Sequence, residues 1–165
     1  MWGLRVSEKQ PKAGEARTEA RIAFAIAKRD DERRLVFGWA SVAVKADGTL
    51  PEDSQGDVID TPEAQRMWED AFYAYVSEIG KGDDMHQLFG VADLVECCVF
   101  TPDKTAAIAK GLGLTGESNA VAAWVGFHLP ETEQGNQAWA AVKSGERAGL
   151  SIVATVLREE LADAA

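Results

Sequence analysis

Few residues in this sequence could carry nucleophilic chemistry, and Ser151 is the clearest of them. It lies in the segment GERAGLSIVATV, residues 145–156, inside an apolar stretch that is typical of a β-strand. A serine nucleophile needs a general base to remove its hydroxyl proton, and the sequence offers only His86 and His128 for that role. His86 follows two aspartates in DDMHQLFG, just before an expected strand. The pattern allows a serine–histidine mechanism, and it equally allows Ser151 to be a small polar residue on a half-exposed strand face.

Other kinds of chemistry find less support. Cys97 and Cys98 are adjacent, a spacing that strains a mutual disulfide and places the two side chains on opposite faces of a strand. The acidic loop with Asp53, Asp57 and Asp60 does not match the alternating spacing of a calcium loop, and no zinc-ligand spacing is present. The glycine-rich KGLGLTG lacks the lysine and hydroxyl residue of a phosphate loop. We therefore expect no metal and no cofactor.

The composition excludes several classes of partner. There are 27 acidic and 17 basic residues, which gives a formal charge of −10. This charge repels phosphate backbones and anionic lipid, so we expect no nucleic acid and no membrane among the partners. No apolar run reaches the ~18 residues that a membrane helix needs, and the start does not resemble a signal peptide. We expect a cytoplasmic protein whose cysteines stay reduced.

The elements that must position Ser151 and His86 are expected to form one domain. Residues 1–20 are polar and charged and predict a flexible arm, residues 21–160 a single domain and residues 161–165 a tail. Periodicity and turn signals predict strands at 21–28, 34–44, 91–102, 120–129 and 148–157, and helices at 61–80, 101–113 and 132–145. This order predicts an α+β fold, with a mostly antiparallel β-sheet or barrel and about three surrounding helices.

Five sequence blocks occur in an order that suggests a family. They are VFGWASVAV, DSQGDVI, DMHQLFGVADLVECCVF, AWVGFHL and AWAAVKSGERAGLSI. Together, over roughly residues 34–156, they resemble the XkdF-like phage serine proteases, a branch of the prohead maturation proteases. That wider group is similar to the herpesvirus assembly proteases, which place a histidine and then a serine on strands of a small β-barrel surrounded by helices.

The resemblance implies a serine endopeptidase that works inside an immature phage head. Its substrates would be the scaffold protein and the major capsid protein, and its location the host cytoplasm and the interior of the prohead. By the match of motifs, His86 is the general base and Ser151 the nucleophile, while His128 receives no role. A homo-oligomer is left open.

Three features support a rival hypothesis, a catalytically inactive head-assembly or scaffold module that retains the protease fold. The first is the ordinary strand pattern around Ser151. The herpesvirus enzymes carry a second histidine after the serine, and this chain has none there. Val153 also stands where the resemblance leads us to expect a small residue. The oxyanion donors stay open between backbone N–H groups near the serine and the side chains of Arg147 and Arg158.

The third catalytic member is predicted to be Glu96, with Asp84 in reserve. If residues 85–97 form a hairpin centred near Val91, positions 86 and 96 pair across it, and their side chains share a face roughly 5 Å apart. A carboxylate there could accept the imidazole N–H of His86 and fix its tautomer. Asp84 would share the face of His86 if the strand already begins at that residue.

Overall fold

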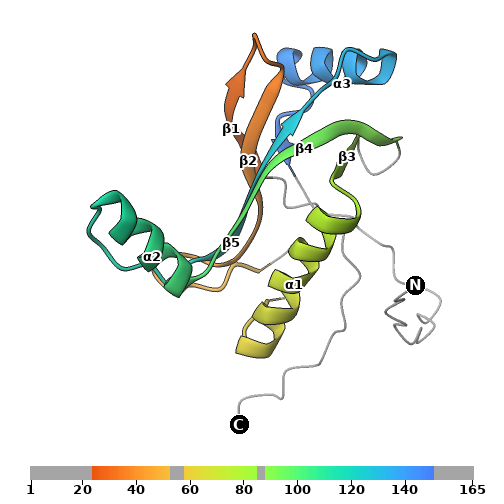
Figure 1. The fold of residues 1–165 in the computed structure, drawn as a ribbon. Helices are drawn as coiled ribbons and strands as arrows, with labels where there is room; N and C mark the ends of the chain where they lie inside the picture. Colours follow the sequence, from red (N-terminus) through yellow and green to blue (C-terminus); the bar gives the residue numbers. More distant parts are fainter. Residues whose placement is uncertain (1–23, 53–57, 85–87, 151–165) are drawn as a thin grey trace, which may run out of the picture.

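A computed structural model describes residues 24–52, 58–84 and 88–150 (Figure 1). Ser151, His86, Arg158 and all of the predicted arm and tail lie outside these ranges. The described elements are, in chain order, β1 (Phe24–Asp30), β2 (Leu35–Val44), α1 (Pro62–Glu78), β3 (Lys81–Asp84), β4 (Leu88–Phe100), α2 (Pro102–Leu112), β5 (Val121–His128), α3 (Glu133–Ser144) and β6 (Gly149–Leu150). The α+β class with an antiparallel sheet and three helices in the described part is confirmed, and the division into arm, domain and tail stays a prediction.

All the described strands belong to one curled sheet. Its order is β3-β4-β5-β2-β1-β6, and every neighbouring pair is antiparallel. The register shifts between Ile26 and Lys28, between Trp39 and Ser41, and again in β4. Such bulges bend strands and increase their twist. The sheet accordingly forms a half-barrel, with the long β4 and β5 curving through its middle (Figure 1).

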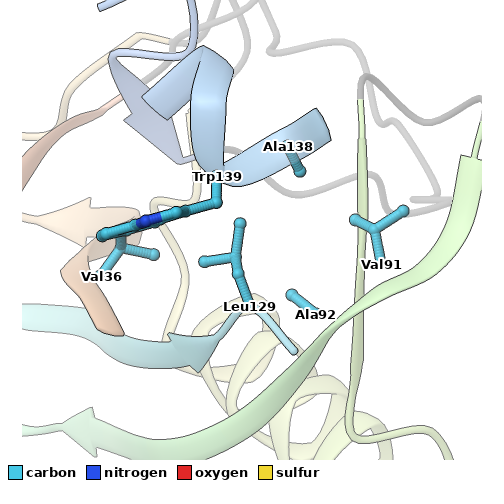
Figure 2. Close-up of a cluster of buried hydrophobic side chains, with 6 residues drawn as sticks. All are labelled: Val36, Val91, Ala92, Leu129, Ala138 and Trp139. Atoms are coloured by element: carbon cyan, nitrogen blue, oxygen red, sulfur yellow. The ribbon is translucent and has the colours of Figure 1, made fainter. Parts of the chain in front are cut away.

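Two groups of buried side chains form most of the core. The first, here called the α3 cluster, joins α3 to β2, β4 and the end of β5, and Figure 2 shows its members: Val36, Val91, Ala92, Leu129, Ala138 and Trp139. The second, the α1 cluster, joins α1 to the central strands through Ala40, Phe72, Val99, Ala123 and Val125. Phe127 and Leu150 pack against both clusters, so α1 and α3 cover the same face of the sheet.

The helices begin and end where their capping residues dictate. The hydroxyl of Thr61 accepts a hydrogen bond from the Ala64 N–H at 3.1 Å, as predicted for the start of α1. Thr132 caps α3 in the same way, accepting from the Gly135 N–H at 3.0 Å. Gly145 follows α3 with a φ of 82°, a left-handed conformation that glycine adopts readily. The chain therefore turns sharply after α3.

The segment after α1 forms a strand that the sequence pattern does not predict. The helix stops before Gly80, whose φ of 60° reverses the chain, and β3 then begins at Lys81. The Tyr75 hydroxyl donates to the Lys81 carbonyl oxygen at 2.7 Å, and burial raises the pKa of Tyr75 to about 12. The Leu94 N–H donates to the Gly80 carbonyl at 3.0 Å. These bonds tie the end of α1 to the β3–β4 hairpin.

Replacing Gly135 with alanine is expected to destabilise the protein. A Cβ at this position of α3 would lie 2.1 Å from the Pro130 carbonyl oxygen, and overpacking of this kind lowers the free energy of unfolding by about 1–3 kcal/mol. Gly111 is the matched control, because it is helical too and no neighbouring atom lies within 4 Å of the added Cβ. Gly111→Ala should instead raise the free energy of unfolding by about 0.5–1 kcal/mol. Urea unfolding measures both effects, and equal stability of the two variants would contradict the expectation.

Candidate active site

The predicted site residues divide into two groups. His86, Ser151 and Arg158 lie outside the described residues, so their placement is not part of this structure. Asp84 and Arg147, which precede His86 and Ser151 in the sequence, are described, and so is Glu96. The described part of the candidate site therefore consists of Glu96 and the residues that lead into the two catalytic candidates.

Asp84 and Arg147 form an ion pair that joins the two edges of the sheet. Arg147 Nε donates to Asp84 Oδ1 at 2.7 Å, and the two side chains are only 30% and 26% exposed. Asp84 is the last residue of β3, at one edge, while Arg147 lies two residues before β6, at the other. The structure thus brings the reserve third member and an oxyanion candidate into direct contact, which the sequence does not predict.

The backbone around Arg147 is anchored to α3 and β1. Its N–H donates to the Ala141 carbonyl in the last turn of α3 at 3.0 Å, and the Ile26 N–H donates to the Ala148 carbonyl at 2.9 Å. Arg147 Nη1 also donates to Glu146 Oε1 at 3.0 Å. The carboxylate of Asp84, followed by that of Glu146, raises the pKa of Arg147, which therefore stays charged.

Leu150, the residue before Ser151, is held inside the half-barrel. It pairs with Phe24 of β1, and its side chain packs between the α1 and α3 clusters. Gly38 of β2 makes room for it, since a Cβ there would lie 3.1 Å from Leu150 Cδ1 and 3.0 Å from the Ala25 carbonyl oxygen. Leu150 therefore faces the core.

The hairpin register that selected Glu96 is wrong. β3 pairs with β4 through Asp84 and Leu88, so the connection lies at residues 85–87 and not near Val91. Glu96 lies opposite Gly126 of β5, and it is eight residues beyond Leu88. At about 3.3 Å per residue, those eight residues span roughly 26 Å along β4. Pairing across this hairpin cannot bring Glu96 beside His86, so the ground on which Glu96 is predicted as the third member is removed.

His128 belongs to a row of charged residues on three neighbouring strands. Its Nδ1 lies 3.9 Å from Asp93 Oδ2, and Lys81 on the other side donates to Asp93. The hydrogen bond from Lys81 is the main reason why the pKa of Asp93 is lowered. All three side chains are more than a third exposed. This row is solvent-exposed, and among the described residues the side chain that His128 contacts in it is Asp93.

The two cysteines lie in different surroundings on β4. Cys97 packs against the α1 cluster, while Cys98 lies opposite Trp124. Burial raises the pKa of the Cys97 thiol, which makes the nucleophilic thiolate scarce. Both are free, and no group of three metal-ligating side chains occurs in the part of the chain that the structure describes.

A cavity of about 260 Å³ borders Arg147. It lies between β1 and the turn after α3, and its lining comprises Ile26, Ala27, Lys28, Arg29, Val142, Gly145, Arg147 and Ala148. This space is a shallow hollow that is open to solvent. Comparisons of the chain with protein families, curated proteins and solved structures find no match.

The observed register makes a prediction for Glu96. We expect Glu96→Gln to react with a serine-directed fluorophosphonate at nearly the wild-type rate, because Glu96 is far along β4 from the residues that lead into His86. Mass spectrometry of the adduct at Ser151 over time gives the rate. A fall of about 10⁴-fold, the size known for loss of a triad carboxylate, would restore Glu96 as the third member.

Proposed function

We propose that this protein is a serine endopeptidase of the phage prohead, with Ser151 as nucleophile and His86 as general base. The observation that carries the proposal is the hydrogen bond between Asp84 and Arg147. It joins two of the sequence blocks on which the resemblance rests, DMHQLFG and GERAGLSI, although the bonded residues are 63 positions apart in the chain.

Chain length permits a meeting of the two catalytic side chains. His86 is two residues from Asp84, and Ser151 is four residues from Arg147. An extended chain spans at most about 7 Å over two residues and about 14 Å over four. Both candidates therefore originate within a short reach of the same ion pair, which is compatible with hydrogen bonding between a serine hydroxyl and an imidazole.

The proposed reaction needs only groups of this chain and water. Ser151 Oγ attacks a peptide carbonyl carbon while His86 takes the hydroxyl proton, and the same proton then passes to the leaving amine. Water, deprotonated by His86, hydrolyses the acyl-enzyme and releases the carboxylate product. Backbone N–H groups near the serine, or Arg158, would donate hydrogen bonds to the oxyanion.

The proposed substrates are the scaffold protein and the major capsid protein, and the proposed location is the host cytoplasm and the prohead interior. The formal charge of −10 supports a protein partner over nucleic acid. No helix among the described residues is long and apolar enough to cross a membrane.

Fluorophosphonate labelling tests the catalytic pair directly. We expect one adduct at Ser151, none in Ser151→Ala, and a large loss of rate in His86→Ala, because the hydroxyl then lacks a base. The rate should also fall below about pH 6.5, where an ordinary imidazole becomes protonated. Full reactivity at pH 4, or in His86→Ala, would contradict a histidine base.

Co-expression with the cognate capsid and scaffold proteins tests the biological role, and it allows for an enzyme that acts only within an assembly. We expect shortened capsid or scaffold chains with the wild-type protein and intact chains with Ser151→Ala. Gel electrophoresis and intact-mass measurement show the difference. Identical fragments with both proteins would contradict the protease, and intact chains with both, together with no labelling, would favour the inactive assembly module.

A further inference from the structure

We propose that Asp84 and Arg147 are a positioning pair, which holds the strand leading into Ser151 against the end of β3. Arg147 then acts through Asp84 and is not an oxyanion donor. This inference rests on the proposed function for the role of Ser151. The pair itself is defined by described residues alone.

The attachment of β6 to the rest of the sheet is slight. In the described residues β6 pairs only through Leu150 with Phe24 and Gly149 with Ala25, at the edge of the sheet. Short ladders at a sheet edge open easily. A side-chain bond from Arg147 to the opposite edge restrains β6 from a second direction, so the position of β6 is defined by both β1 and β3.

The ion pair also completes a closed loop of contacts that runs through β3, β4 and α3. From Asp84 the chain continues into β4, where Val91 and Ala92 pack against Ala138 and Trp139 of α3. The end of α3 holds the Arg147 backbone through the Ala141 carbonyl, and the Arg147 side chain returns to Asp84. A bond that closes a loop of this kind fixes relative positions more strongly than a surface pair between two mobile side chains.

The surroundings of Arg147 do not suit an oxyanion donor. Its Nε donates to Asp84 and its Nη1 to Glu146, so two carboxylates already balance its charge. An oxyanion donor must direct its hydrogen bonds at the charge that develops in the transition state. The guanidinium is instead committed to the protein, in the bond that joins the two sheet edges.

The test compares charge-removing and charge-exchanging variants. Arg147→Gln and Asp84→Asn each remove one partner, and the double variant Asp84→Arg with Arg147→Asp exchanges them. Lys104→Gln is the matched control, because Lys104 and Glu69 form a pair of similar exposure, 33% and 21%, between α2 and α1. Two rates are measured: hydrogen exchange of the Ile26 N–H, which is bonded to the Ala148 carbonyl, and fluorophosphonate labelling at Ser151.

We expect each single variant to lose about tenfold in exchange protection at Ile26, a factor that a charge-assisted hydrogen bond of ordinary strength supports. The labelling rate at Ser151 should fall by a similar factor. The double variant should recover both the exchange protection and the labelling rate, and Lys104→Gln should leave both unchanged. An oxyanion donor predicts the reverse: Asp84→Asn keeps its labelling and the exchanged pair does not recover. That result, or unchanged protection in both single variants, would overturn the inference. If the wild type is never labelled, the proposed protease fails, and exchange at Ile26 alone still decides whether the pair fastens β6.

Discussion

The hydrogen bond between Asp84 and Arg147 closes a sheet whose strand order leaves its two ends unpaired. In a complete barrel the first and last strands are joined by a backbone ladder, which removes the edges altogether. Here β3 and β6 are the edges, and a side-chain ion pair joins Asp84 of β3 to Arg147, two residues before β6. The pair is compatible with a half-barrel because two side chains reach across a wider space between strands than a backbone ladder does. Among the described residues, the backbone groups at the ends of β3 and β6 are not joined to each other by such a ladder. These two ends directly precede the segments that contain the residues proposed for catalysis.

Close packing at glycines allows the sheet to curl this far. The ring of Phe37 lies against Gly126, where a Cβ would be 2.6 Å from two ring atoms. The ring of Phe127 lies against Gly82, where a Cβ would be 3.2 Å away. At both glycines, the space that a side chain would take is occupied by an aromatic ring from another strand. Since Phe127 packs against both core clusters, room for its ring at Gly82 brings β3 onto the same core as α1 and α3.

The sequence predicts elements better than it predicts register. Thr61 and the apolar periodicity predict α1, and the apolar stretch at 148–157 predicts a strand where β6 begins, because both signals are local. The β3–β4 hairpin is different. A hairpin is predicted near Val91 from the sequence, but in the structure Gly90, with a φ of 79°, lies within β4 next to a register shift. A glycine in an apolar run is typical of a turn and also of a bulge, and local pattern does not separate them. The contact of Asp84 with Arg147 depends on this register and on the curl, so no local signal predicts it.

Arg34 holds the other end of α3, and it does so in a strained conformation. Its φ of 54° is left-handed, which costs a residue with a side chain on the order of 1–3 kcal/mol. The guanidinium donates to the Asn136 side chain at 2.7 Å and to the Gly135 carbonyl at 3.1 Å, and the Arg34 carbonyl accepts from the Leu129 N–H at 3.0 Å. Hydrogen bonds from a charged group contribute about 1.5–3 kcal/mol each, which acts against the strain. One arginine thus fixes the start of α3 to the β1–β2 turn and another, Arg147, fixes the chain after its end to β3. With both ends held, Trp139 is fixed over Val36 and Leu129 (Figure 2), and the strand that leads to Ser151 leaves α3 in one direction.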